Sequence, residues 1–267
     1  MEPISECCED LVVLLNAHAT AADKAPTVED RVRAADAACA YYQGVGICEL
    51  LLDAEVDAFF HHFIRSAQSR RWVLQQRPGP LGTVPSVSGI MKASNTRGLF
   101  AAMAAGQWRL AEDIARLSPD AWSAADEYED DFCYASFLHG HLLGAAHDQL
   151  DAILARFEKA LEGGEAVRRD LCRALLAKEA SALLAAFDAL IAERDEHLAK
   201  LRQGPMCRDS LFTPFASVYV EGLAWLALLE RAGVATPAEV DYCPALVRTT
   251  AFAPFVPSSF PGLPLEG

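Results

Sequence analysis

Five carboxylates lie close together in the segment DEYEDDF, residues 126–132, just ahead of several histidines. Carboxylate and imidazole side chains are the usual ligands of Mg²⁺, Mn²⁺ and Zn²⁺, and together they can also act as general acid and base. On a helix with about 100° per residue, however, these carboxylates spread over more than half of the circumference. Metal ligands must converge on one point, so we expect no metal ion and no cofactor at this segment.

The downstream histidines give no stronger indication of a metal site. His139 is predicted to face the core and His141 points roughly the other way, so the two cannot share an ion without ligands from other helices. The pair HD at 147–148, combined with His61 or His62, is also compatible with an all-α metal-dependent phosphohydrolase, although such short motifs often arise by chance. DEYED likewise matches the Asp-rich motif of helical isoprenoid synthases, but the sequence has no second metal motif and no basic patch for a diphosphate. Both enzymes stay open as alternatives.

Another carboxylate, Glu221, lies in the most apolar stretch of the chain, residues 211–230. An ionised carboxylate in the middle of a bilayer costs about 2.5–3.5 kcal/mol, so we predict a buried core helix here and not a membrane span. A buried glutamate can be a general base with a raised pKa, but it is more often a structural acid paired with an arginine or with backbone donors. We favour the structural role, and no nucleophile elbow, phosphate-binding glycine loop or dinucleotide fingerprint indicates an enzyme.

The acidic segment can also contact another protein. A stripe of six side chains is predicted to face the core, namely Tyr128, Phe132, Ala135, His139, Leu142 and Ala146. Tyr134 and Phe137 lie towards the acidic side, and aromatic residues beside charge are typical of an interface or of a helix that passes from solvent into the core. The candidate partner-binding residues are therefore Asp126, Glu127, Glu129, Asp130, Asp131 and, as an aromatic anchor, Tyr134. A solvated helix face is the alternative.

The charge of the whole chain also favours contact with another protein. The 267 residues carry a formal net charge of −14, which repels nucleic acids and favours a basic protein partner, although solubility alone also explains it. Acidic residues near the N-terminus argue against a secretory signal, and the eight cysteines have no repeated Cys-x-x-Cys spacing. We expect a cytoplasmic protein with reduced, buried thiols that binds neither nucleic acid nor a membrane.

The elements that must position these residues are helical. The chain is rich in alanine and leucine and poor in β-branched residues, and it shows no alternating apolar pattern between tight turns. Helices are predicted at 5–23, 27–43, 47–70, from a cap at Ser94 or Asn95 to Gly106, at 107–117, from a Ser118 cap to about 145, at 148–162, 165–202 with a break near 177–181, 211–230, and as a short helix or turn at 236–248. Thr27 and Asp30 form a capping-box pattern, whereas Gly44 and Gly46 are expected to interrupt their helix.

We therefore predict an all-α fold of antiparallel helical hairpins, packed as a bundle or a short solenoid-like array. Residues 1–248 are expected to form a single helical domain with a candidate sub-boundary at the Pro- and Gly-rich segment 77–89. Residues 249–267 are expected to form a Pro-rich extended tail that is packed by its phenylalanines or disordered.

Four segments resemble, in order, bacterial polymorphic-toxin immunity proteins of the immunity protein 49 type. They are RGLFAAMAAGQWRLAEDIARLSPDAW, EYEDDFCYASFL, ALLAAFDALIAERDEHL and SLFTPFASVYVEGLAWLALLERAGVATPAEVDYCPALV. The resemblance covers roughly residues 90–248 and leaves the N-terminal third unmatched. It implies a non-enzymatic protein that binds and neutralises a cognate secreted antibacterial toxin, of a kind delivered by contact-dependent or type VI-like secretion. Many such toxins are basic nucleases, which fits the acidic surface. A helical scaffold or regulatory protein with a non-toxic partner is a further alternative.

Overall fold

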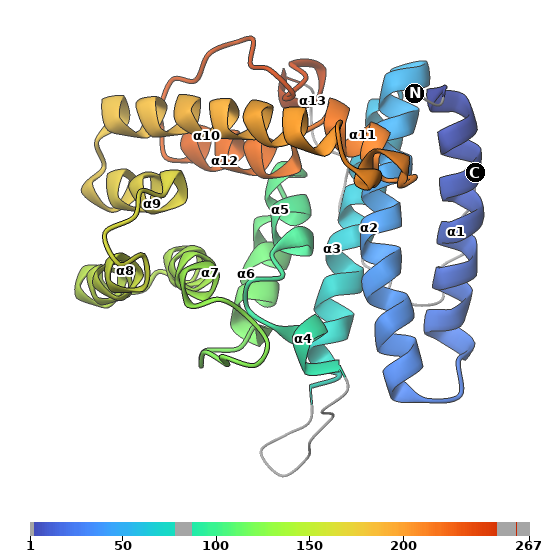
Figure 1. The fold of residues 1–267 in the computed structure, drawn as a ribbon, viewed down its shortest axis with the longest axis horizontal. Coiled ribbons are helices and arrows are strands. Elements are labelled where there is room, and N and C mark those ends of the chain that lie inside the picture. Colours follow the sequence, from blue (N-terminus) through green and yellow to red (C-terminus); the bar gives the residue numbers. More distant parts are fainter. Residues whose placement is uncertain (1–2, 78–86, 250–259, 261–267) are drawn as a thin grey trace.

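The computed structural model describes residues 3–77, 87–249 and 260, and every regular element in these residues is a helix (Figure 1). The helices are α1 (Ile4–Lys24), α2 (Val28–Asp53), α3 (Val56–Gln75), α4 (Ser88–Met91), α5 (Arg97–Ala104), α6 (Trp108–Leu117), α7 (Glu129–Leu142), α8 (His147–Ala160), α9 (Val167–Ala177), α10 (Ala180–Leu201), the 3₁₀ helix η2 (Pro205–Arg208), α11 (Phe212–Ser217), α12 (Val220–Arg231) and α13 (Leu246–Thr249). The predicted all-α class is confirmed. None of the described helices combines the length and apolar character that a membrane span requires.

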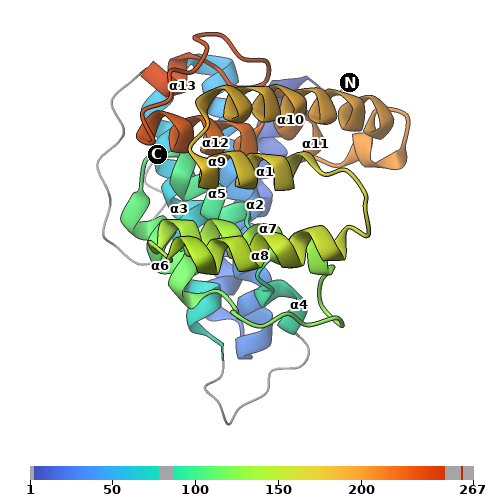
Figure 2. The same cartoon turned by 90° about the vertical axis from the view of Figure 1, so that its left-hand side faces the viewer.

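The three longest N-terminal helices stand side by side at one end of the molecule (Figure 1). Helices α5 and α6 lie next to α3, and α7 to α10 with α12 occupy the other end. Figure 2 views this second end directly and shows α7 and α8 in front of α1 to α3. Most of the described connections between consecutive helices are short, and neighbouring helices pack in an antiparallel manner, as predicted.

The start of α2 is capped by the predicted pair, Thr27 and Asp30. The Thr27 side chain accepts a hydrogen bond from the backbone N–H of Asp30, with an Oγ1 to N distance of 3.1 Å, and donates one to the Asp30 carboxylate. One of the amide groups that a helix start leaves without a partner is thereby satisfied.

Helix α2 runs without a break from Val28 to Asp53, so the predicted interruption at Gly44 and Gly46 is wrong. These glycines mark close approaches between elements. A Cβ at Gly44 would lie 2.8 Å from Leu211 Cδ2, and one at Gly46 would lie 2.8 Å from His62 Cβ on α3. Packing across the helix, which local propensity does not report, keeps these glycines inside it.

Some helix boundaries follow the sequence and others do not. Gly106 ends the α5 turn in the left-handed conformation, with φ 65°, as predicted. The predicted caps at Ser94 or Asn95 are wrong, because α5 begins after Thr96 without a side-chain cap. Ser118 does not start a helix either. It closes α6, its hydroxyl donating to the Ile114 carbonyl, and residues 119–128 form turns and bends.

The C-terminal helices keep most of their predicted positions. The predicted break near 177–181 is present, with Lys178 in the left-handed conformation at φ 56° between α9 and α10. The apolar helix expected at 211–230 is divided into α11 and α12 at Val218 and Tyr219, where the Tyr219 amide donates to the Tyr242 carbonyl. In the segment 236–248 only the residues of α13 are helical, and the Thr236 hydroxyl donates to Glu230 instead of capping a helix.

The buried apolar side chains form two clusters. One joins α1 and α2 with parts of α3 and α4, and the other is built from the end of α2 and from α3, α5 to α10 and α12. Phe260 packs in the first cluster, its ring in edge-to-face pairs with the rings of Tyr42 and Trp72. The rest of the predicted linker, 78–86, and nearly all of the tail lie outside the described residues, so the domain boundaries stay a prediction.

Candidate partner-binding site

The acidic segment does not lie on one helix. Tyr128 is extended, with φ −70° and ψ 148°, and α7 begins only at Glu129. The helical angles calculated from Asp126 therefore do not apply to residues 126–128. The prediction that Tyr128 faces the core is wrong, because 80 % of its surface is exposed. It is the most exposed large apolar side chain among the described residues.

Helix α7 enters the core immediately after its first turn and is buried on both sides. Phe132 and Ala135 are buried as predicted, but Tyr134 and Phe137, expected near the acidic surface, are buried as well. Tyr134 is only 5 % exposed, so this structure does not present it as an aromatic contact. Tyr128 is exposed because the helix starts later than predicted, whereas Tyr134 is buried because neighbouring helices cover α7 on both sides.

The first two acids of the segment tie their loop to the protein. Asp126 accepts hydrogen bonds from the hydroxyls of Ser88 at 2.8 Å and Ser123 at 2.7 Å. Glu127 is buried, and its carboxylate accepts a hydrogen bond of 2.8 Å from the Ser94 amide. Both groups are used internally, and their presence is explained by the loop they hold.

The three acids in the first turn of α7 are placed differently. Glu129 accepts a 2.7 Å hydrogen bond from Arg156 on α8. Asp130 is half-buried and Asp131 exposed, and neither forms an ion pair with the described residues. Partial burial and the charge of Asp130 raise the pKa of Asp131 above its ordinary value, although cationic neighbours oppose this. Acids at a helix start also interact favourably with the helix dipole.

Glu221 is the centre of a buried polar network, which supports the structural role. It is 8 % exposed and accepts two hydrogen bonds of 2.8 Å from Arg168, one to each carboxylate oxygen. The hydroxyls of Tyr134 and Tyr219 donate to the same carboxylate at 2.7 and 2.9 Å. The indole of Trp225 in turn donates to the Tyr134 hydroxyl at 2.8 Å.

This network keeps Glu221 ionised. Burial alone would raise the pKa of Glu221, but the hydrogen bonds and charge of Arg168, with the two tyrosine hydroxyls, hold it below its ordinary value. A general base at neutral pH requires the opposite shift. The network joins α7, α9 and α12, and its members satisfy one another, so it positions helices and leaves no reactive group.

The histidines are spread over separate environments. Burial, with the charge of Arg70, lowers the pKa of His139 to about 3, whereas His141 faces a surface pocket. His62 lies 3.2 Å from Glu49, and His147 is exposed at the start of α8. Within 3–77 and 87–249, no three His, Cys, Asp or Glu side chains come together as metal ligands could. None of the eight cysteines, all of which the structure describes, forms a disulfide.

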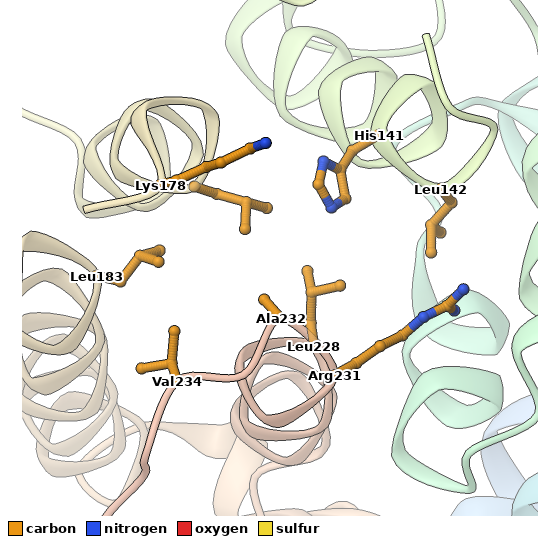
Figure 3. Close-up of a pocket in the computed structure, with 9 residues that line it drawn as sticks. His141, Leu142, Lys178, Leu183, Leu228, Arg231, Ala232 and Val234 are labelled. Atoms are coloured by element: carbon orange, nitrogen blue, oxygen red, sulfur yellow. The ribbon is translucent and has the colours of Figure 1, made fainter. Parts of the chain in front are cut away.

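A pocket of about 400 Å³ opens between the ends of α7, α9 and α12 and the start of α10 (Figure 3). Its walls are aliphatic and consist of Leu142, Leu175, Leu183, Leu228, Ala232 and Val234. Its polar side chains are His141, Lys178 and Arg231, and no carboxylate lines it. The residues that line this pocket are far apart in the sequence, so no motif or spacing in the sequence predicts that they come together.

The sequence model of the immunity protein 49 family matches residues 17–246. The chain belongs to the immunity protein 49 family. The match extends the expected resemblance, roughly 90–248, into the N-terminal third, so α2 and α3 are part of the family unit. Neither a curated protein nor a solved structure matches the chain.

Membership in the immunity protein 49 family indicates which kind of site the structure should contain. Immunity proteins inhibit toxins without catalysing a reaction, so the chain is a toxin-neutralising protein and not an enzyme. The phosphohydrolase and isoprenoid-synthase interpretations are therefore wrong. A surface that contacts the toxin is the functional site that such a protein needs.

Proposed function

We propose that this immunity protein neutralises its cognate toxin by binding a basic surface of the toxin with the start of α7. The contact surface, called the α7 acidic face below, consists of Tyr128, Asp130 and Asp131, with Trp122 and Glu129 at its edge. Asp126 and Glu127 support it from behind through the loop that they hold. Tyr134, in the core, supports the helix and makes no direct contact.

The exposed tyrosine is the observation that carries this proposal. An aromatic side chain that is 80 % exposed leaves apolar surface in water, and covering it with a partner is favourable. Aromatic residues are also enriched in the binding hot spots of interfaces. The neighbouring carboxylates of Asp130 and Asp131 form no ion pair with the described residues and can pair with cations of a partner. Trp122 adds a second, partly exposed ring, and its indole donates to the Glu127 carbonyl in the same loop.

The charge of the molecule supports a basic partner. With a net charge of −14, the protein attracts cationic proteins over a distance and accelerates their encounter. A nuclease that binds phosphates with a basic cleft fits this description, and the acidic face then covers the cleft by mimicking the charge of its substrate. In the proposed setting the toxin is delivered by a type VI-like or contact-dependent route, and the immunity protein acts in the cytoplasm.

The experiment measures binding of the cognate toxin domain. The variants Tyr128→Ala and Asp130→Lys/Asp131→Lys remove the aromatic and the charged part of the face separately. We expect each to weaken binding by at least about tenfold, because hot-spot aromatics contribute about 2 kcal/mol or more and juxtaposed like charges cost several kcal/mol. Wild-type association should also slow steeply as salt is added.

A matched control is available on α1. Glu9 and Asp10 are adjacent, exposed acids that precede the matched segment, and α1 lies at the opposite edge of the molecule (Figure 1). The variant Glu9→Lys/Asp10→Lys makes the same change in net charge and should bind almost as the wild type does. If both double variants weaken binding equally, only the net charge matters and the α7 acidic face is not the contact. If neither α7 variant weakens it, the toxin binds elsewhere.

A further inference from the structure

The pocket at the other end of α7 has a character opposite to that of the acidic face. Lys178 and Arg231 line it together with aliphatic side chains, Lys178 ending beside His141 and Arg231 on the side of Leu142 (Figure 3). In a protein with 37 acidic and 23 basic residues, a concave site that has two cations and no lining carboxylate is a local reversal of charge. This reversal is the feature that requires an explanation.

The positions of the two cations are fixed by the fold. Lys178 follows α9 in the left-handed conformation, and Arg231 is the last residue of α12. The guanidinium of Arg231 lies over the ring of Trp108, 4.4 Å from its centroid, which limits its freedom. Cations near helix C-termini interact favourably with the helix dipole, but this does not explain why a pocket lies between them.

We propose that this pocket binds a segment of the toxin in which an aliphatic side chain stands next to a carboxylate. This inference rests on the proposed function, since it assigns a second contact to the same partner. The aliphatic side chain fills the space between Leu183 and Leu228, and the carboxylate pairs with Lys178 and Arg231.

Size and chemistry both select this occupant. A volume of about 400 Å³ lies in the range of sites that enclose a small ligand or an anchoring side chain. Burial, together with the charge of Arg231, lowers the pKa of His141, so its imidazole is neutral near pH 7 and can donate a hydrogen bond without attracting an anion by itself. The guanidinium of Arg231 can bind a carboxylate through two parallel hydrogen bonds.

The first test uses small probes and needs no toxin. N-acetyl-leucine and N-acetyl-leucinamide share the aliphatic side chain but differ in the carboxylate, and each is titrated into ¹⁵N-labelled protein. We expect saturable shifts of pocket amides, such as those of Leu175 and Val234, with the carboxylate probe binding on the order of fivefold more tightly than the amide. Lys178→Gln/Arg231→Gln should abolish this preference, while Lys200→Gln, an exposed lysine outside the pocket, should preserve it.

The second test uses the toxin domain. The variant Lys178→Glu/Arg231→Glu should weaken toxin binding on the order of tenfold, and saturating N-acetyl-leucine should compete with the toxin. If the wild type binds the toxin and this variant binds it equally well, the pocket proposal is overturned while the proposed function stands. If the probe binds but does not compete, the pocket is a site for small carboxylates and does not dock the toxin. Absence of pocket shifts, or equal shifts with both probes, overturns the proposal by itself.

Discussion

Replacing Glu221 by glutamine tests whether the buried network holds the helices together. Glutamine has nearly the same shape, and its carbonyl oxygen can still accept from Arg168 and Tyr134. Its amide group, however, then faces two donors, Arg168 Nη2 and the Tyr219 hydroxyl, which lie 2.8 and 2.9 Å from Oε2 in the wild type. The substitution therefore removes charge-assisted hydrogen bonds without leaving a cavity.

The expected magnitude follows from these contacts. A hydrogen bond to a charged group contributes about 1.5–3 kcal/mol, and breaking one side of a buried pair costs about 3–5 kcal/mol. The Arg168 side chain is 38 % exposed, so water replaces part of what the arginine loses. We expect Glu221→Gln to lower the free energy of unfolding by about 2–3 kcal/mol. Glu158→Gln is the matched control, because its ion pair with Arg173 is exposed and should contribute less than about 1 kcal/mol.

The same pair of proteins gives a pH test. Because the folded pKa of Glu221 is lowered, its stabilisation is present above the unfolded pKa and is lost as the pH falls through the folded value. The difference in the free energy of unfolding between wild type and Glu221→Gln should therefore stay constant above about pH 5 and narrow as the pH falls below about 4.5. Urea unfolding followed by circular dichroism measures the free energy of unfolding of both proteins at each pH. The comparison holds where the dependence of this free energy on urea concentration is the same for both. A loss below about 1 kcal/mol at neutral pH, or a difference that does not narrow in acid, would refute the reasoning.

Three further substitutions test other parts of the structure by the same unfolding assay. Gly98→Ala would place a Cβ only 2.2 Å from Arg70 Cβ, so we expect at least about 1–3 kcal/mol of destabilisation from forced separation of α3 and α5; near-neutral stability would contradict this contact. Thr27→Ala removes the acceptor for the Asp30 amide and should cost about 1 kcal/mol, whereas no change would mean that the cap is not formed. His139 has a pKa lowered to about 3, so the unfolded chain takes up a proton there below about pH 6.5 while the folded chain does not. His139→Leu should therefore lose less stability than the wild type between about pH 7 and about pH 4, and equal losses would place His139 outside the core.

Local signals in the sequence were sufficient where the structure depends on local chemistry. The Thr27 cap, the turn at Gly106 and the break at Lys178 involve backbone groups within a few residues of one another. The burial of Glu221 also followed from its apolar neighbours, and so did its need for a cationic partner. The partner itself, Arg168, is 53 residues away and could not be chosen from the other arginines.

Tertiary packing decided the positions that the sequence misassigned. Gly44 and Gly46 stay helical because Leu211 and α3 approach too closely for a side chain. Tyr128 occupies the N-cap position of α7 and makes no side-chain cap, so no capping residue in the sequence indicates where this helix starts. Because α7 begins at Glu129 and not just after Ser118, Tyr128 lies before the helix and is exposed, whereas Tyr134 is buried because α7 is covered on both sides.

The two proposed contact regions lie at opposite ends of one helix that the core holds rigidly. Helix α7 has 14 residues, which corresponds to a length of about 20 Å, and a single standard interface can cover both ends. Exposed charges act mainly on the rate of association, whereas a side chain buried in a pocket acts mainly on the rate of dissociation. In the proposed complex the acidic face therefore brings a basic toxin to the protein, and the pocket keeps it there. Because the Glu221 network fixes α7 before the toxin arrives, little conformational entropy is lost on binding, and the surface acts as a preformed template.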